Sequence, residues 1–364
     1  MAVSTIDPNG LNIGQIGGTR NRIINGAMVI DQRNAGASIV GNNGVFPVDR
    51  WVTTSSQASK YDIGQNEGAV TPPAGFTNYL GVTSSSAYTV GASETFSIRQ
   101  LIEGYNVADL GWGTANAQSV TLSFWVRSSL TGTFGGTLKA SGGTRTYPFT
   151  YTISASNTWE QKAITVAGDT TGTWLTTNGI GLQIQFGLGV GATLSGTAGA
   201  WSSSNFNSAT GATSVVGTSG ATWYITGVQL EAGDTATPFE HRSYGQELAL
   251  CQRYYQVVDV NGTVSFRWAA GYGNTGNMAF LLPTPMRSSA SFTSLTTLTS
   301  RNLYNQATDS NVTSGGMTAS LSIGRPTAIQ IFVGSVSGSL GGSGGDPFII
   351  GGGSETLFAF DAEL

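Results

Sequence analysis

The sequence predicts an all-β protein: an antiparallel jelly-roll β-sandwich, followed by a short helix and a second, smaller β domain. Three observations lead to this prediction. Apolar and polar residues alternate along most of the chain, which is the pattern of half-buried strands. Clusters of Gly, Asn, Thr and Ser lie between these stretches, as turns require. No helical pattern interrupts the alternation before residue 243, which favours a sandwich over an α/β fold.

Three strands of the sandwich are predicted together with their faces. The core-facing residues expected in 119–129 are Val120, Leu122, Phe124 and Val126. Those expected in 179–189 are Ile180, Leu182, Ile184, Phe186 and Leu188. Residues 221–233 are expected to carry Trp223, Ile225, Gly227 and Gln229 on one face, and Tyr224, Thr226, Val228 and Leu230 on the other. Tryptophans inside such alternating stretches are assigned to packing; they are Trp51, Trp159 and Trp223.

One stretch has a helical pattern instead. Ser243 with Gln246 three residues later predicts a capping box, and Leu248, Cys251 and Tyr255 then share one helical face. Alternation resumes in 277–287, 327–338 and 356–364 and predicts a second β domain. The expected organisation is an N-terminal anchoring segment at 1–20, a sandwich at 21–242, a connecting helix at 243–256 and a C-terminal β domain at 257–364.

Composition excludes several classes of protein. The 364 residues include 52 glycines and only 10% charged residues, yet 16 Phe, 12 Tyr and 8 Trp are too many aromatic residues for a disordered chain. The net charge is −4 and the basic residues are scattered, so nucleic acid is not an expected partner. No secretory signal or membrane-spanning apolar run is present, so we expect synthesis in a cytoplasm and no membrane insertion.

Residues for catalysis or for a metal are sparse. The single histidine, His241, and the single cysteine, Cys251, could form a nucleophilic pair, but Cys251 lies on the apolar helical stripe and is expected to be a core residue. The acidic residues occur singly, which does not indicate the carboxylate pair of a glycosidase. Glu103 or Asp109 could contribute to a structural calcium site, but no ligand set is recognisable. We therefore expect no enzyme, no cofactor and no metal.

Binding is the function that remains. Sugars are recognised by stacking on aromatic rings and by hydrogen bonds to their hydroxyls. The aromatic residues expected in loops, and therefore proposed from sequence as ligand-binding, are Tyr105, Trp112, Trp201, Trp268 and Tyr272. For any one of these rings, packing in the core or between subunits is the alternative.

The chain also resembles a known family. The resemblance is carried, in order, by NRIINGAMVIDQRNAG (21–36), FPVDRWV (46–52), IRQLIEG (98–104), VTLSFWVRSSLTGTF (120–134), AGDTTGTW (167–174), GVQLEAGDTATPFEHRSYGQELALCQRYYQ (227–256) and the terminal FDAEL. These motifs resemble virion appendage proteins of tailed bacteriophages, which are fibre or fibre-like proteins with a carbohydrate-binding-module-type jelly roll. PTPMRSSASF (283–292) resembles the distal domain of such fibres.

The resemblance implies a structural protein exposed on the virion surface. It implies a homotrimer, anchored through residues 1–20 to other virion proteins, that presents its β domains toward the host surface. Together with the aromatic residues above, this leads us to expect non-covalent adsorption to host surface glycans as a tail or side fibre. A capsid decoration or head fibre with no receptor role is the first alternative. A polysaccharide depolymerase is the second.

Overall fold

The computed structural model describes residues 20–259, 265–268, 276–294, 302–305, 310–313, 318–324, 328–334, 347–351 and 357–364. Beyond residue 258, side chains are described only for 282–291 and 358–364. The chain divides into two compact units, residues 1–247 with Leu364, and residues 248–363. Each unit is considered by itself below.

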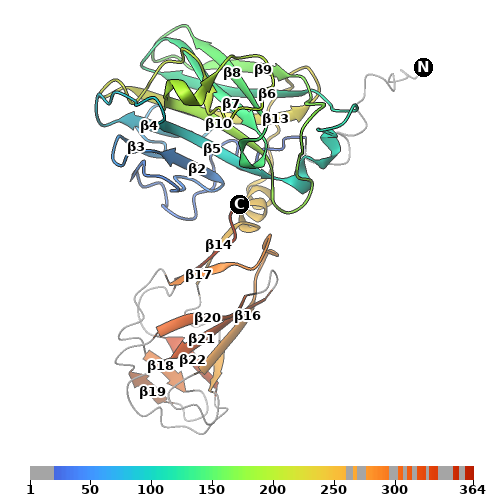
Figure 1. Cartoon of the computed structure of the whole chain (residues 1–364). Helices are drawn as coiled ribbons and strands as arrows, with labels where there is room; N and C mark the ends of the chain where they lie inside the picture. The colour runs from blue at the N-terminus through green and yellow to red at the C-terminus, as the bar shows by residue number, and fades with distance from the viewer. Residues whose placement is uncertain are drawn as a thin grey trace, which may run out of the picture. The chain divides into compact units, whose positions relative to one another are not determined.

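The first unit is a sandwich of two antiparallel sheets (Figure 1). The six-stranded sheet has the order β1-β3-β4-β13-β6-β9, formed by β1 (Ile39–Val40), β3 (Tyr61–Gln65), β4 (Leu80–Ser84), β13 (Thr222–Ala232), β6 (Val120–Ser128) and β9 (Glu160–Val166). The five-stranded sheet has the order β2-β5-β10-β7-β8, formed by β2 (Trp51–Ser55), β5 (Thr95–Glu103), β10 (Ile180–Val190), β7 (Gly132–Lys139) and β8 (Thr146–Ile153). A short parallel pair, β11 (Ser195–Gly196) and β12 (Ser208–Ala209), lies in the β10–β13 connection.

The strand order is that of a jelly roll. If β4 to β10 and β13 are taken as eight successive strands, one sheet contains the first, eighth, third and sixth as neighbours. The other sheet contains the second, seventh, fourth and fifth. This interleaving of two four-stranded sheets is the double Greek key of jelly-roll proteins. The predicted fold class is therefore confirmed, and β1, β2 and β3 extend the edges of the two sheets.

The core lies between the sheets and follows the predicted alternation on two strands. All four predicted residues of β6, from Val120 to Val126, belong to the buried cluster, as do Leu182, Ile184, Phe186 and Leu188 of β10. Ile180, also predicted on the core face, is only half-buried and lies before an irregularity in the pairing of β10 with β5. Trp51 and Trp223 are fully buried, as predicted. Trp159 is half-buried and lies just before β9, so it packs from a loop rather than from within a strand.

Strand β13 departs from the predicted alternation at Gly227. Its pairing with β6 shifts between Thr226 and Gln229, and Gly227 has a φ of +61°, which identifies a β-bulge. The extra residue turns Val228 and Leu230 to the same face as Trp223, so all three are in the core. The prediction that placed Val228 and Leu230 opposite Trp223 is therefore wrong, because a bulge reverses the phase of every residue after it.

Residues 20–25 are held by polar groups from β13 and the segment after it. The side-chain amide of Asn21 donates to the carbonyl of Val228 at 3.1 Å, and its Oδ1 accepts the N–H of Leu230 at 3.0 Å. The carboxylate of Glu240 accepts the backbone N–H groups of Arg20 and Asn21, at 3.2 and 2.7 Å. The first described residues thus form part of the sandwich unit.

Arg242 and Glu247 complete this contact. Arg242 donates to the backbone carbonyls of Ile23, at 3.0 Å, and Asn21, and its guanidinium lies 3.3 Å from Glu247 Oε1. Glu247 Oε1 also accepts the N–H of Asn25 at 2.5 Å. We call Glu240, Arg242 and Glu247 the clamp. It explains why the NRIING and FEHRSYGQE motifs occur together, since each satisfies the polar groups of the other.

The predicted capping box is present at the start of α1 (Tyr244–Gln252). Ser243 Oγ accepts the N–H of Gln246 at 3.4 Å, and Gln246 Oε1 accepts the N–H of Ser243 at 3.2 Å. The helix is shorter than the expected 243–256. Tyr255 begins β14 (Tyr255–Asp259), whose backbone pairs with β23 (Leu357–Asp361), and a residue in that ladder cannot continue a helix.

The second unit contains two further antiparallel sheets. One has the order β14-β23-β17, with β17 at Ser291–Ser294. The other has the order β19-β18-β22-β15-β16-β21-β20, formed by β19 (Ser310–Thr313), β18 (Asn302–Asn305), β22 (Pro347–Gly351), β15 (Ser265–Trp268), β16 (Gly276–Leu281), β21 (Ala328–Gly334) and β20 (Thr318–Gly324). The strand predicted at 277–287 ends at Leu281, because Pro283 and Pro285 cannot donate to a ladder.

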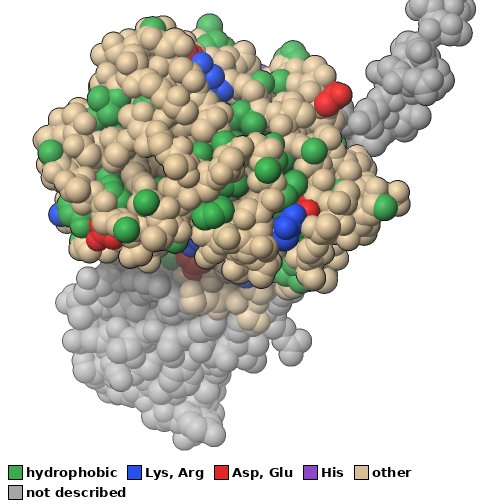
Figure 2. Space-filling model, turned by 45° about the horizontal axis from the view of Figure 1, so that its top comes forward, with side chains coloured by type: hydrophobic (Ala, Val, Ile, Leu, Met, Phe, Trp, Pro, Cys, Tyr) green, Lys and Arg blue, Asp and Glu red, His purple; other side chains and the backbone are tan. Residues whose placement is uncertain are grey.

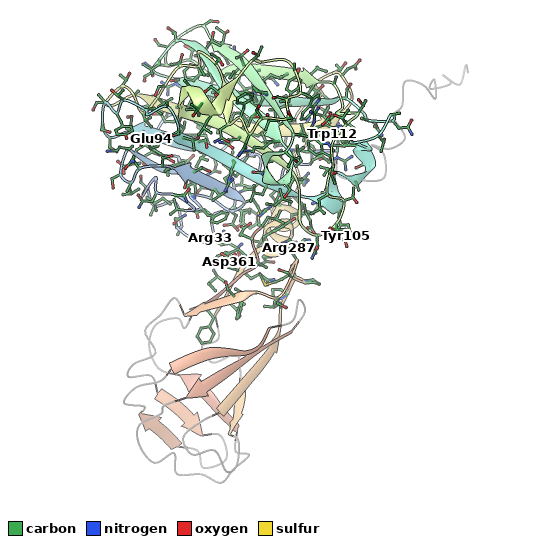
Figure 3. The ribbon with its side chains drawn as sticks, in the orientation of Figure 1. Arg33, Glu94, Tyr105, Trp112, Arg287 and Asp361 are labelled. Carbon is green, nitrogen blue, oxygen red and sulfur yellow. The ribbon has the colours of Figure 1, made fainter. Side chains whose placement is uncertain are left out.

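Arg287 links two of the recognised motifs inside this second unit. Its guanidinium donates to the backbone carbonyls of Ala362, at 2.9 Å, and Glu363, at 3.0 Å. Figure 3 shows Arg287 and Asp361 on neighbouring parts of the chain. PTPMR and the terminal FDAEL therefore form one local structure.

Candidate functional site

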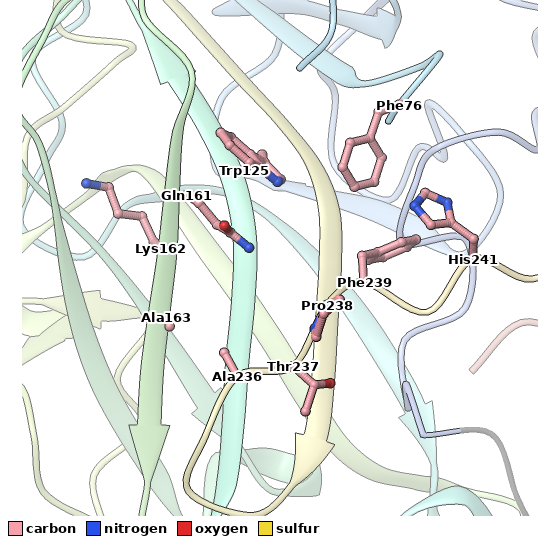
Figure 4. Close-up of a pocket in the computed structure, with 10 residues that line it drawn as sticks. All are labelled: Phe76, Trp125, Gln161, Lys162, Ala163, Ala236, Thr237, Pro238, Phe239 and His241. Carbon is pink, nitrogen blue, oxygen red and sulfur yellow. The ribbon is translucent and has the colours of Figure 1, made fainter. Parts of the chain in front are cut away.

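An open pocket with aromatic walls lies on the outer face of the six-stranded sheet. Its volume is about 630 Å³, within the range of small-molecule sites. Figure 4 shows the described residues that line it, from the segment before β4, from β6 and β9, and from the segment after β13: Phe76, Trp125, Gln161, Lys162, Ala163, Ala236, Thr237, Pro238, Phe239 and His241. We call it the aromatic pocket.

The floor of the aromatic pocket follows from strand pairing. Trp125 of β6 is directly opposite Gln161 of β9, so both side chains lie on the face away from the core. Ala163 follows Gln161 on that face, and its short side chain leaves the sheet surface open beside the tryptophan ring. Lys162 points away from the rings and its ammonium bonds Glu160 Oε2 at 2.6 Å (Figure 4).

Three rings form the opposite wall. The centroids of Phe76 and Phe239 are 5.1 Å apart, and the imidazole of His241 lies 5.4 Å from Phe76 and 4.9 Å from Phe239. These are edge-to-face and tilted contacts, which stabilise aromatic clusters. The wall is therefore pre-organised, although its residues come from segments far apart in the sequence.

The bulge at Gly227 makes room for these rings. A Cβ atom on Gly227 would lie 2.6 Å from Phe76 Cζ and 3.2 Å from Trp125 Cδ1. The residue also has a positive φ, which favours glycine. The same residue thus reverses the phase of β13 and lets Phe76 and Trp125 approach each other.

A buried carboxylate fixes the segment that carries Thr237 and Phe239. Glu231 is fully buried; its Oε1 accepts the N–H of Thr237 at 2.8 Å, and its Oε2 accepts the Thr237 hydroxyl at 2.6 Å. Gln229 Oε1 accepts the N–H of Glu240 at 2.8 Å. Arg20 Nε lies 3.6 Å from Glu231 Oε2 and gives the carboxylate a counter-charge. The wall is therefore held by β13 rather than left as a free loop.

Trp125 differs from the other described tryptophans in its indole N–H. Within the described residues this group has no hydrogen-bond acceptor, and Figure 4 shows the indole nitrogen on the side of the ring that faces Phe76 and Phe239. Six other indole N–H groups have acceptors 2.7 to 3.2 Å away; they belong to Trp51, Trp112, Trp159, Trp174, Trp201 and Trp223. A half-exposed ring with a free donor is suited to a ligand that has hydroxyl groups.

Two of the aromatic residues proposed from sequence pack against each other instead. Trp112 is only 8% exposed, and its ring lies 4.7 Å from Trp174 and 5.3 Å from Trp201 in edge-to-face contacts. Its indole donates to the carbonyl of Gln118 at 2.7 Å. Trp112 is therefore a packing residue in this structure. Trp201 is partly exposed and lines a second, smaller pocket of about 330 Å³.

The other three aromatic residues proposed from sequence lie outside the aromatic pocket or outside the described residues. Tyr105 is 60% exposed in the short helical turn Gly104–Asn106, outside the aromatic pocket (Figure 3). Trp268 ends β15, but its side chain lies outside the described residues, and so does the whole of Tyr272. Of the three whose side chains the structure describes, Trp112 and Trp201 pack together, and Tyr105 lines neither pocket.

The structure also places the residues that were considered for catalysis or for a metal site. Cys251 is fully buried, which confirms its assignment to the core, whereas His241 is exposed in the aromatic pocket. Glu103 is buried, and Asp109 accepts a hydrogen bond from Arg22 at 2.5 Å. Within the part of the chain that the structure describes, no group of three or more His, Cys, Asp or Glu residues is arranged to hold a metal ion.

No helix formed by the described residues has the length and hydrophobicity needed to cross a membrane.

The aromatic pocket was not predicted from the sequence, although one signal was available. Trp125 lies between the predicted core residues Phe124 and Val126, so period-two alternation puts it on the face of β6 opposite the core. A tryptophan on the polar face of an amphipathic strand is a candidate contact residue, because tryptophan is enriched at interfaces. Phe76, Phe239 and His241 gave no such signal, because their meeting depends on tertiary contacts.

Comparison with known proteins gives fold-level likeness only. No protein-family model matches the chain, and no curated protein is significantly similar to it in sequence. Similar solved structures include the enzymatically active domain of tailspike protein 4 of bacteriophage CBA120, with 12% identity and a TM-score of 0.32. That match covers 59% of this chain and 22% of the tailspike chain.

Carbohydrate-binding modules are also among the similar structures. A family 4 module has 14% identity and a TM-score of 0.28, over 57% of this chain and 98% of the module. The family 11 module of Clostridium thermocellum, solved with a mixed-linked tetrasaccharide, has 11% identity and a TM-score of 0.26, over 55% and 98%. All three TM-scores are below 0.5, so the jelly-roll assignment rests on the strand order described above.

Proposed function

We propose that the protein binds carbohydrate non-covalently in the aromatic pocket. The observation that carries this proposal is Trp125, a half-exposed ring whose indole N–H has no acceptor among the described residues, in a pocket walled by Phe76 and Phe239. The rings offer apolar surface to the C–H face of a sugar, and the exposed amide of Gln161 offers hydrogen bonds to its hydroxyls.

Binding without cleavage is part of the proposal. Hydrolysis of a glycosidic bond ordinarily uses two carboxyl groups on either side of the bond. The ten described lining residues include no Asp or Glu. The pocket therefore has the groups for stacking and hydrogen bonding, and we propose that a bound sugar leaves it unchanged.

The setting that we propose is the surface of a phage virion, as a homotrimeric tail or side fibre attached through residues 1–20. Its support is the resemblance carried by the FEHRSYGQELALCQRYY block, whose clamp residues Glu240, Arg242 and Glu247 have the architectural role expected of a scaffold element. A mass in solution three times the 37.6 kDa of one chain is the expected result. A monomeric mass would contradict the proposed trimer but would leave the proposed sugar-binding site untested.

The binding proposal is tested with the full chain on an array of bacterial surface glycans, followed by calorimetry with the best ligand. Trp125→Ala removes the ring and the free donor, and we expect at least about tenfold weaker binding. Tyr105→Ala is the matched control. It removes an exposed ring outside the pocket and is expected to leave the affinity unchanged.

Three outcomes would count against this account. Equal loss in both variants, or loss only in Tyr105→Ala, would move the site away from the pocket. Absence of any glycan binding by the wild type would favour a passive structural protein of the capsid or head. A fall in the viscosity of host polysaccharide would indicate a depolymerase.

A further inference from the structure

A row of polar side chains crosses the outer face of the five-stranded sheet. Gln183 of β10 is directly opposite Lys139 of β7, and Gln185 of β10 is directly opposite Arg99 of β5. Lys139 and Gln183 therefore lie side by side, and Arg99 lies diagonally from Gln183 on the next strand, all three on the face away from the core. This face belongs to the other sheet from the aromatic pocket.

Both cations of this row have only neutral partners. Lys139 is 6% exposed, and its ammonium donates to Asn205 Oδ1 at 2.7 Å and to Asn207 Oδ1 at 2.8 Å. Arg99 is half-buried and donates from Nη1 to Gln183 Oε1 at 3.4 Å, while its buried Nε has no hydrogen-bond partner. Neither forms a salt bridge with a carboxylate among the described residues.

This arrangement is electrostatically unfavourable as it stands. Burial lowers the pKa of Lys139 to about 8, and the positive charge of Arg99 contributes to the shift. Burial also lowers the pKa of Arg99. Of the groups facing Lys139, which include Gln183, Asn205 and Asn207, only Arg99 is charged. Amide oxygens solvate an ammonium group but do not neutralise it.

Two other poorly exposed cations of the unit are paired with carboxylates. Arg145 forms two hydrogen bonds with Asp169, at 2.7 and 2.8 Å, and Arg242 lies 3.3 Å from Glu247. Acidic residues outnumber basic ones in this chain, 20 to 16, so carboxylates are not in short supply. Buried charges in proteins are ordinarily paired, so an anion would be the natural partner of Arg99 and Lys139.

We propose that Arg99 and Lys139 form a binding site for an oxyanion, a carboxylate, sulfate or phosphate group. The planar guanidinium of Arg99, which is only half-buried, suits two oxygens of such a group. Lys139 supplies the second positive charge, and the amide of Gln183 lies between them. Two sources share this chemistry: a free inorganic anion, and the acidic substituent of a polysaccharide.

The test is a calorimetric titration of the full-length protein at pH 7 with three probes: sodium sulfate, glucuronate and uncharged glucose. Sodium chloride of equal ionic strength is the background control. We expect saturable binding of sulfate or glucuronate, and none of glucose at this site. Preference for glucuronate would indicate a sugar-borne anion, and preference for sulfate a free one.

Variants locate the site. Arg99→Gln and Lys139→Met are each expected to weaken anion binding by about tenfold or more, the effect of losing a charge-assisted hydrogen bond. Lys60→Met is the matched control, because Lys60 is a half-buried lysine elsewhere in the unit, over the Tyr88 ring. No binding by the wild type, or full binding by both site variants, would overturn the proposal.

A measurement on the unaltered protein covers the case in which a variant does not fold. The pKa of Lys139 can be followed by NMR with labelled lysine, with and without saturating sulfate. Because a bound anion stabilises the ammonium form, the pKa is expected to rise on binding. An unchanged pKa would contradict the site. Neither experiment involves Trp125, so the two proposals can fail independently.

Discussion

Individual residues determine the shape of the aromatic pocket. Gly227 is the clearest case, because one residue without a side chain sets the phase of β13 and leaves space for Phe76 and Trp125. Two physical effects act there: the positive φ, which any L side chain resists, and the short distance from a Cβ to the Phe76 ring. These effects can be separated.

Gly227→Ala is expected to destabilise the protein by about 2–4 kcal/mol, from backbone strain and from displacement of Phe76. Gly220→Ala is the matched control: its φ is +74°, but no atom lies within 4 Å of its Cβ position, so only strain of about 1–2 kcal/mol is expected. Denaturant unfolding of both variants gives the comparison. Equal losses would show that the rings do not depend on the bulge.

Lys139 gives the protein a pH dependence of definite sign. Its pKa is about 8 in the folded state and 10.5 in an unperturbed lysine, so between these values the unfolded chain binds more protons. Stability therefore rises with pH in this window. In buffer without oxyanions, we expect the free energy of unfolding to increase by about 1–2 kcal/mol from about pH 8 to 9.5. Lys139→Met should abolish the rise, and the same rise in that variant would assign it to another group.

At the scale of elements, the clamp shows how separate motifs become one structure. Arg242 is almost fully buried and satisfies two backbone carbonyls of residues 20–25 as well as Glu247. Its removal would leave a poorly solvated carboxylate and unpaired carbonyl groups. By contrast, Arg22 pairs with Asp109, whose side chain is 55% exposed. The two arginines therefore make unequal contributions.

Arg242→Met is expected to lower the free energy of unfolding by about 2–4 kcal/mol, the usual effect of breaking a buried ion pair on one side. Arg22→Met should cost less than about 1 kcal/mol, since an exposed pair contributes little. Chemical denaturation monitored by tryptophan fluorescence measures both. Similar losses of unfolding free energy in the two variants would contradict the view that burial makes the Arg242 contacts more stabilising than the Arg22 contact.

The sequence was sufficient for strands whose alternation is unbroken. β6 and β10 were predicted with their core faces, because period-two patterning and burial agree there. The sequence pattern failed at Gly227, where a bulge moves the following residues of β13 to the other face of the sheet although the pattern of residue types continues. The pattern also predicted a helix as far as Tyr255, because an apolar residue seven positions after Leu248 fits a helix and a strand equally well. The aromatic pocket needed tertiary contacts that no local pattern contains.

At the scale of the whole molecule, charge is sparse, because only 10% of the residues are charged. Figure 2 shows scattered acidic and basic side chains on one face of the described part, with small green areas between larger tan ones. Long-range electrostatic steering is therefore weak, and recognition depends on local contacts. Such a surface suits a ligand that is itself rich in hydroxyl groups.

The most direct test of the sugar site is a two-dimensional NMR titration that follows the tryptophan indole N–H signals of the full-length protein. The probe is the glycan that binds most strongly on the array. The Trp125 signal is expected to shift saturably, because its donor gains an acceptor, while those of the fully buried Trp51 and Trp223 stay in place. Saturable binding that leaves the Trp125 signal unmoved would contradict the account.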